Sequence, residues 1–198
     1  ESAKRHFDQA LAIRIAQKPE QKLQMAESYY SLYQHAARCN DYGGILDYAQ
    51  RSLAHALAAV GENHPLVAEC YIGIGNYNYF IDNADKALEY YRRAHEILVR
   101  LFGPVHYRTI ATLTNMAACY AEKGGYAEAI EHHHQARKVT WQLYGENAWY
   151  ANSCTYLGQV YATQKKYQEA LYWYDKSLAV HQKLGVPLPV QRRLQYNE

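Results

Sequence analysis

The side chains that most often carry out chemistry are present in this sequence, but their spacing does not suit a shared reaction. Residues 132–134 are three consecutive histidines. Neighbouring residues of a helix point about 100° apart, so three such side chains cannot converge on one metal ion. Ser28, Ser31 and His35 fall on one expected helix, but no oxyanion hole accompanies them. We therefore predict a protein that is not an enzyme and that holds no metal or cofactor.

The four cysteines are also too far apart to form a site. Cys39, Cys70, Cys119 and Cys154 follow one another at steps of 31, 49 and 35 residues, and no pair has the C-x-x-C spacing of zinc and redox motifs. We expect four small, buried and reduced thiols. The two glycines around Ile74 lack the rest of a dinucleotide-binding fingerprint, so we expect no phosphate loop there.

The composition excludes several classes of protein. The 198 residues carry 21 Lys and Arg against 19 Asp and Glu, and a formal charge of +2 is too small for a nucleic-acid arm or a disordered polyelectrolyte. Short basic pairs such as Arg92-Arg93 lie among acidic residues, which predicts solvated mixed-charge surface and no contact with nucleic acid. No run of about 18 apolar residues exists, so we expect no membrane span. The polar start shows no signal-peptide pattern, and we expect an intracellular, cytoplasmic protein.

A period of 42 residues organises the chain. Ala87 and Ala129 share one column of this period, and Gly61, Gly103 and Gly145 share another. Glycine and proline end helices, and the prolines cluster at the same junctions as the glycines, so each period is bounded by a break. Within each period, apolar and small residues recur at three- and four-residue steps on both sides of a short polar segment. This pattern predicts two amphipathic helices per period.

The residues of each period resemble the tetratricopeptide repeat (TPR) family. The fourth copy carries the family pattern most fully, with Leu157-Gly158 and Tyr161 on its first helix and Ala170 and Tyr174 on its second. The usual TPR unit has about 34 residues, and the longer unit here resembles the kinesin light chain type. The resemblance implies an all-α fold, a right-handed TPR α-solenoid of antiparallel helix pairs with about nine helices.

Counting the copies predicts a single TPR solenoid over residues 1–198. We expect a lone second helix of a preceding repeat at 1–17, and the start of a further helix or a tail at 186–198. Between these segments we predict four full repeats, at 20–60, 62–102, 105–144 and 146–184. Because the chain begins within a repeat, we expect it to belong to a longer protein that has other domains.

In TPR proteins the first helices of the repeats line a concave groove, and the resemblance implies the same face as the peptide-binding groove here. The side chains that we select on this face are amides, tyrosines and one cation: Tyr30, Gln34, Arg38, Asn76, Tyr79, Asn115, Tyr156 and Gln159. Amide side chains both donate and accept hydrogen bonds, and tyrosine offers a flat ring with a polar tip, so the set suits an extended peptide. Asn115 is our strongest choice, because light-chain-like repeats often carry an asparagine there.

Two more specific ligands do not fit this face. Chaperone-binding TPRs hold the C-terminal carboxylate of a partner with lysine and arginine side chains, but those positions here hold Ile72, Asn152 and Tyr156. Without cationic donors a carboxylate gains no charge-assisted hydrogen bonds. Arg38 is the one cation of the expected groove against several glutamates, so we do not expect the acidic cargo motifs that kinesin light chains bind.

The repeat columns account for much of an unusual aromatic content, 21 Tyr against 3 Phe. We expect scaffold tyrosines to bury the ring and to keep the hydroxyl near water; these are Tyr29, Tyr71, Tyr91, Tyr120, Tyr126, Tyr161, Tyr167 and Tyr174. His133 takes the buried aromatic column in the third copy, and we expect the histidines on either side of it to be solvated.

Three functions remain open at this point. The first is a non-catalytic scaffold that binds a partner peptide or helix in the groove. The second is a signal-transduction sensor, in which ligand binding switches an attached output domain. The third is an assembly module, in which exposed tyrosines and Trp149 mediate self-association.

Overall fold

The structure is a computed structural model that describes residues 5–6, 8–9 and 21–185. All regular secondary structure within these residues is α-helical, which confirms the predicted fold class. From residue 21 to residue 185 eight helices follow one another: α2 (Lys22–Cys39), α3 (Tyr42–Val60), α4 (Pro65–Phe80), α5 (Ala84–Phe102), α6 (Tyr107–Glu122), α7 (Tyr126–Tyr144), α8 (Ala148–Thr163) and α9 (Tyr167–Leu184). The helix expected at 1–17 and the segment expected at 186–198 lie outside the described residues, apart from 5–6 and 8–9.

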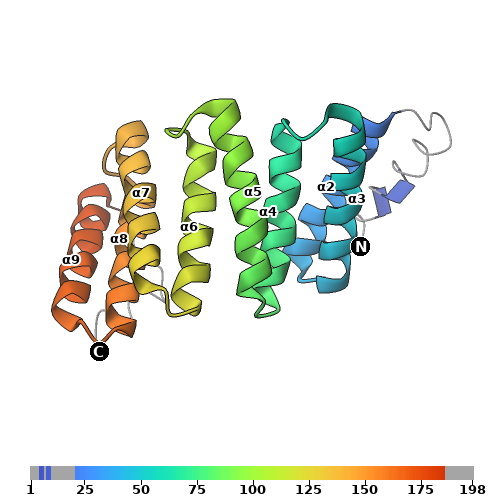
Figure 1. The fold of residues 1–198 in the computed structure, drawn as a ribbon. Coiled ribbons are helices and arrows are strands. Elements are labelled where there is room, and N and C mark those ends of the chain that lie inside the picture. The colour runs from blue at the N-terminus through green and yellow to red at the C-terminus, as the bar shows by residue number, and fades with distance from the viewer. Residues whose placement is uncertain (1–4, 7, 10–20, 186–198) are drawn as a thin grey trace. The chain divides into compact units, whose positions relative to one another are not determined.

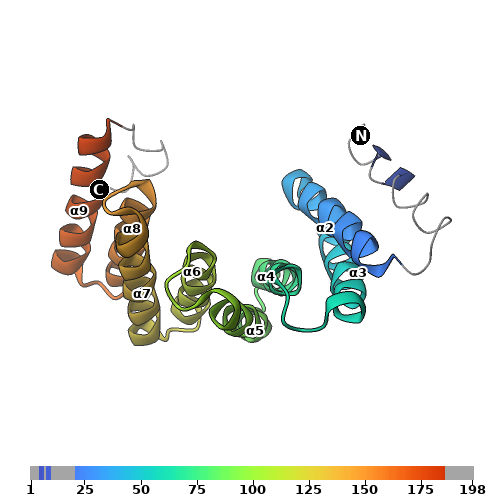
Figure 2. The ribbon, with the colours of Figure 1, turned by 90° about the horizontal axis from the view of Figure 1, so that it is seen from above.

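By internal contacts the chain divides into two compact units, Glu1–Gly103 and Pro104–Glu198. In the first unit α2 packs against α3, α3 against α4, and α4 against α5. In the second unit α6 packs against α7, α7 against α8, and α8 against α9. Figure 1 shows each unit as two helical hairpins, and Figure 2 shows α4 and α5 side by side, nearly end-on.

Each second helix from α3 to α9 ends at a glycine of the repeat column, and Gly185 after α9 has a φ angle of 63°. Gly61, Gly103 and Gly145 follow α3, α5 and α7 with φ angles of 70°, 81° and 65°, a region that side-chain-bearing residues rarely adopt. The next first helix then begins with a side-chain cap. Nδ1 of His64 accepts a hydrogen bond from the backbone N–H of Leu66 at 3.1 Å, which satisfies a donor of the first turn.

The turn inside each helix pair has a left-handed residue at a second column. Asn40, Asp82, Gly124 and Lys165 have φ angles of 54°, 58°, 78° and 59°. Asparagine, aspartate and glycine tolerate this conformation, whereas a lysine in it is strained. The fourth turn therefore keeps the shape of the others with a less suitable residue.

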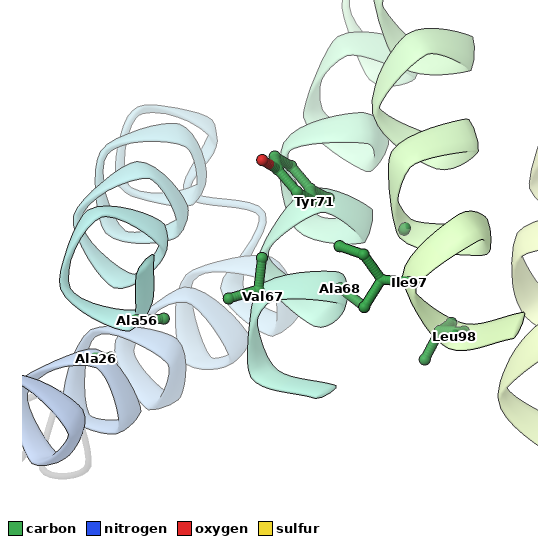
Figure 3. Close-up of a cluster of buried hydrophobic side chains, with 8 residues drawn as sticks. Ala26, Ala56, Val67, Ala68, Tyr71, Ile97 and Leu98 are labelled. Atoms are coloured by element: carbon green, nitrogen blue, oxygen red, sulfur yellow. The ribbon is translucent and has the colours of Figure 1, made fainter. Parts of the chain in front are cut away.

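The core of the first unit is built from small residues where helices meet and larger ones between those meeting points. Figure 3 shows part of this cluster, in which Ala26 and Ala56 face Val67 and Ala68 across α2, α3 and α4. The ring of Tyr71 packs into the same cluster, while its hydroxyl oxygen points away from the aliphatic residues of α5 (Figure 3). Tyr71 is 7% exposed, so it buries its ring as predicted.

The prediction for the scaffold tyrosines is wrong at Tyr167, the first residue of α9, which is 63% exposed. The equivalent Tyr42 begins α3 and stacks on Phe80 of the next repeat, with ring centroids 4.1 Å apart. Tyr42 is itself 39% exposed despite this stacking, so the ring at this column is not fully buried in the first repeat either.

The two helices of a pair touch where a large ring meets a residue with almost no side chain. A Cβ atom on Gly158 would lie 2.4 Å from the ring of Tyr174, and one on Gly75 would lie 2.6 Å from the ring of Tyr91. Both distances are far inside van der Waals contact, so these positions require glycine while the tyrosines are present.

The other two copies have residues of different size at the equivalent positions. The third copy has Ala117 and the smaller ring of His133 there, and both are buried. The first copy reverses the order, with Tyr33 on the first helix and Ala49 on the second. The ring of Tyr33 instead packs over Gly73, where a Cβ atom would lie 2.8 Å away. The two glycines around Ile74 therefore accept tyrosine rings, and they lie inside α4 and form no phosphate loop.

Candidate functional site

In the first unit, the selected residues of α2 lie beside a carboxylate of α4. The hydroxyl of Tyr30 donates a hydrogen bond to Oε2 of Glu69 at 3.2 Å. Burial, reinforced by this carboxylate, raises the pKa of Tyr30 well above its usual range, so its hydroxyl stays protonated. Gln34 and Arg38 are exposed farther along the same helix. This part of the face offers polar groups to solvent.

Asn76 on α4 is tied to the scaffold. The hydroxyl of Tyr91 donates to Oδ1 of Asn76 at 2.8 Å, and Nδ2 of Asn76 donates to the hydroxyl of Tyr33 at 3.5 Å. The amide therefore links two structural tyrosines, which leaves less of it for a ligand. Tyr79, one turn later, is 38% exposed.

In the second unit, a pocket of about 310 Å³ opens between α6 and α8. Nine residues line this α6–α8 pocket: Tyr107, Ile110, Ala111, Thr114, Asn115, Trp149, Asn152, Ser153 and Tyr156. It brings together Asn115 and Tyr156, two of the residues selected from the sequence. None of the nine carries a charge, while four of them carry an amide or a hydroxyl on a short side chain.

Two aromatic residues of this pocket are not among those predicted for the groove from the sequence, where Trp149 was expected only in self-association. Tyr107 is 49% exposed and Trp149 is 54% exposed, and both lie in the first turn of their helices. The signal was helical periodicity, since Tyr107 stands four residues before Ala111 and Trp149 stands three before Asn152. Extending the helical spacing of the groove positions by one turn towards the start of each helix would have selected both residues. Gln159, in contrast, is half-buried on α8 and does not line the pocket.

Tyr156 also packs on the side away from the pocket. Its ring stacks on the imidazole of His133, with centroids 5.4 Å apart and planes 16° apart. His133 is 4% exposed, as predicted for the aromatic column. Burial, together with the neighbouring histidines, lowers the pKa of His133 to about 4. The imidazole that packs on Tyr156 is therefore neutral near pH 7.

The three consecutive histidines of α7 have three different neighbours. His132 contacts the ring of Tyr120 and His134 contacts the ring of Trp173, each with centroids 5.2 Å apart. Both flanking histidines are half-buried, so the expectation that they are solvated is wrong, because aromatic rings of α6 and α9 cover them. Among residues 21–185 and the few described before them, no group of three His, Cys, Asp or Glu side chains could hold a metal ion.

Three of the thiols are unreactive by burial. Burial raises the pKa of Cys70 and Cys154 to about 11, and that of Cys119 to about 12. Cys39 is exposed, which corrects the prediction of four buried thiols. It is the last residue of α2 and directly precedes Asn40, the left-handed residue of the turn.

Comparison with known proteins decides the family. A model of the tetratricopeptide repeat matches residues 24–99, 81–140 and 108–183. The chain belongs to the tetratricopeptide repeat family. None of the helices of this TPR chain between residues 21 and 185 is long and apolar enough to cross a membrane.

Solved structures with the same fold include BtubC (BKLC) from P. vanneervenii. It is 19% identical with a TM-score of 0.83, over 92% of this chain and 73% of that one. A putative kinesin light chain from Podospora anserina, with nearly identical TPR-like repeats, is 17% identical with a TM-score of 0.79, over 93% of this chain and 87% of that one. The resemblance to the kinesin light chain type of repeat is therefore confirmed at the level of the fold.

A Rap protein in complex with competence and sporulation factor has the same fold as well. It is 18% identical with a TM-score of 0.70, over 82% of this chain and 44% of that one. Together, the family match and these folds support a protein-interaction scaffold.

Proposed function

We propose that this TPR chain is a non-catalytic scaffold whose first-helix face binds a peptide or helix of a partner protein, with the α6–α8 pocket as the main contact. The observation that carries this proposal is the lining of the pocket. Tyr107 and Trp149 expose about half of their surface, while Asn115 and Asn152 add amides to the same lining. Exposed aromatic rings beside partly buried hydrogen-bonding groups are typical of the anchor sites of protein interfaces.

The size and charge of the pocket indicate the kind of segment that it takes. About 310 Å³ is at the small end of ligand sites, so it suits one or two side chains of a peptide. The lining holds no charged side chain, so an acidic or basic anchor would lose its hydration without gaining an ion pair. We therefore expect an apolar or aromatic anchor, with the asparagines bonding to the peptide backbone of the partner.

A role without catalysis fits the same residues. The buried thiols hold protons at neutral pH, and His133 lies behind Tyr156, away from the pocket lining. We further propose that the chain works inside the cell, where Cys70, Cys119 and Cys154 stay reduced as the free thiols that the structure has. Binding of nucleic acid is not part of this proposal, because the charge of the chain is close to balanced.

A sensor is the alternative function, and the Rap structure favours it. That protein shares this fold and is held in complex with competence and sporulation factor. If the present chain is a sensor, an output domain must be attached to it, and ligand binding must change the activity of that domain. Self-association through Trp149 is a third possibility, and light scattering at high concentration would reveal it as a mass above that of one chain.

The first test is Asn115→Ala, measured with a partner peptide obtained by panning a peptide library against the full chain. Loss of the amide should weaken binding about tenfold, because a buried backbone group of the peptide loses its hydrogen bond. Circular dichroism and thermal melting should be nearly unchanged, since Asn115 is on the surface of α6. Gln50→Ala serves as the matched control, because it removes an exposed amide from α3, a second helix outside the proposed binding face. Equal affinity of wild type and Asn115→Ala would contradict the proposal.

A further inference from the structure

A second pocket of the second unit has a different chemical character. It measures about 600 Å³ and shares no residue with the α6–α8 pocket. We call it the α7 pocket, and its lining is rich in charged and aromatic side chains: Glu131, His134, Gln135, Arg137, Lys138, Trp141, Glu146 and Tyr150. The lining comes from α7 and from the start of α8, where the junction between the third and fourth repeats lies.

Arg137 belongs to this lining and has no acidic partner among the described residues. Its guanidinium lies over the rings of Tyr150 and Trp173, 5.6 Å and 5.3 Å from their centroids. One of its terminal nitrogens, Nη1, donates to the hydroxyl of Tyr150 at 3.0 Å. Nε is buried and has no acceptor, and no carboxylate of the described residues pairs with this side chain. A half-buried guanidinium in this state has unused hydrogen-bonding capacity.

A second cation lies near the indole ring of Trp173. The ammonium of Lys176 on α9 lies 5.4 Å from the centroid of Trp173 and 4.8 Å from that of Tyr172. It too forms no ion pair with a carboxylate of residues 21–185. The positive charges of Arg137 and Lys176 repel each other. Both groups nevertheless lie against the ring of Trp173, where cation–π attraction offsets the repulsion.

The other repeats show how this chain normally treats such a cation. In the first repeat Arg51 lies over a tyrosine ring and pairs with Asp47 at 2.9 Å. In the second repeat, 42 residues later, Arg93 lies over a tyrosine ring and pairs with Glu89 at 2.7 Å. In both, the acid stands four residues before the arginine on one helix face, which is the favourable spacing for such a pair.

The third repeat breaks this arrangement. One further step of 42 leads to Glu131 and to Gln135, a neutral amide that donates to Glu131 at 3.2 Å. The arginine of this repeat is Arg137, two residues after Gln135. It therefore lies on a different face of α7 from Glu131. The remaining carboxylate of the lining, Glu146, accepts from Lys183 at 2.7 Å. The acids of the α7 pocket are thus bonded elsewhere, while Arg137 keeps its charge unpaired.

We propose that the α7 pocket binds an oxyanion, a phosphate monoester or a carboxylate, carried by a side chain of a partner protein. The planar fork of Arg137 would hold two oxygens, as guanidinium groups do with both kinds of anion. Lys138 adds a second positive group at the rim, and Trp141, which is 51% exposed, offers contact area to the residues that flank the anion. This site is separate from the proposed groove site, so either of the two can fail without the other.

The three tryptophans of the chain make a direct test possible. Trp141 lines the α7 pocket and Trp173 contacts Arg137, whereas Trp149 lines the α6–α8 pocket. The full chain, labelled with ¹⁵N, is titrated with N-acetyl-phosphoserine amide, with N-acetyl-glutamate amide and with neutral N-acetyl-serine amide. We expect a saturable shift of the indole N–H signals of Trp141 and Trp173 with at least one of the anionic probes, and no shift of Trp149. Saturation by the phosphorylated probe alone assigns a phosphate monoester, and saturation by the glutamate probe assigns a carboxylate.

Variants of the arginines complete the test. Arg137→Gln should raise the dissociation constant at least about tenfold, because it removes a charge-assisted pair. Arg93→Gln is the matched control, since it removes a ring-stacked arginine that already has its acid, and it should leave the constant unchanged. If Arg137→Gln fails to fold, Arg137→Lys keeps the charge without the planar fork and should still weaken binding. Equal affinity of the wild type and the foldable Arg137 variant, or shifts that do not saturate with either anion, would overturn the proposal.

Discussion

At the scale of single residues, Tyr156 joins the core to the candidate site. Its ring packs on His133, and the same residue lines the α6–α8 pocket. The family register was enough to select Tyr156 and Asn115 for this face. The family pattern did not select Trp149. Its groove positions begin after the first turn of each first helix, and Trp149 lies in that first turn.

His133 gives this arrangement a dependence on pH. Its pKa in the folded chain is about 4, against an ordinary value of 6.5, because burial disfavours the charged ring. Between these two values the unfolded chain takes up a proton that the folded chain does not, so stability falls as the pH falls through this window. From pH 7 to pH 5 the loss from this one group should be about 2 kcal/mol.

The measurement is the free energy of unfolding in urea at pH 7 and pH 5 for wild type and His133→Leu. The variant should lose less stability on acidification than the wild type, by about 2 kcal/mol, because leucine does not titrate. All other groups contribute alike to both proteins, so the difference isolates His133. The same acid sensitivity in both proteins would show that the ring is not buried in its neutral form.

At the scale of the helices, the two backbone columns explain why the sequence predicted the elements well. Glycines at positive φ end the second helices, and a left-handed residue forms the turn inside each pair. Glycine at these positions indicates the local backbone geometry directly, whereas Lys165 at the fourth turn does not. The exposure of Tyr167 depends on packing between helices, and no local pattern reveals that.

Lys165 is the weak position of the turn column. Its φ angle is 59°, where the equivalent residue of the third repeat is Gly124. Lys165→Gly should raise the free energy of unfolding by about 0.5–1 kcal/mol, because the strain of a side chain in the left-handed region outweighs the added freedom of the unfolded chain. Urea unfolding of the two proteins checks this, and Gly124→Lys should have the opposite sign. A stability unchanged or lowered by Lys165→Gly would count against strain at this turn.

The contact between Gly158 and Tyr174 tests the packing rule of the helix pairs. Gly158→Ala should lower stability by about 1–3 kcal/mol, because the added Cβ atom would lie 2.4 Å from the ring. Adding Tyr174→His recreates the pair that the third repeat has in Ala117 and His133. The double variant should be more stable than the sum of the single effects predicts, by about 1 kcal/mol or more. Strictly additive effects would mean that the two positions do not share one space.

At the scale of the whole molecule, the 42-residue period is what the sequence revealed most firmly. It predicted an all-helical TPR chain because each column repeats a packing need that every pair of helices shares. The candidate sites lie where the copies differ from one another. Asn115 and Trp149 give the α6–α8 pocket its neutral lining, and the loss of the ion pair at Gln135 gives the α7 pocket its unpaired arginine.

The proposed groove site depends most directly on the ring of Trp149. The decisive measurement is the dissociation constant of a library-selected partner peptide for the wild type, for Trp149→Ala and for Trp141→Ala, by isothermal titration calorimetry. Both variants remove an exposed tryptophan from the second unit, but only Trp149 lines the α6–α8 pocket. We predict that Trp149→Ala weakens binding at least about thirtyfold, as expected for an aromatic anchor, while Trp141→Ala leaves it within about twofold. Unchanged binding by Trp149→Ala, or a loss confined to Trp141→Ala, would contradict a partner site on the first-helix face.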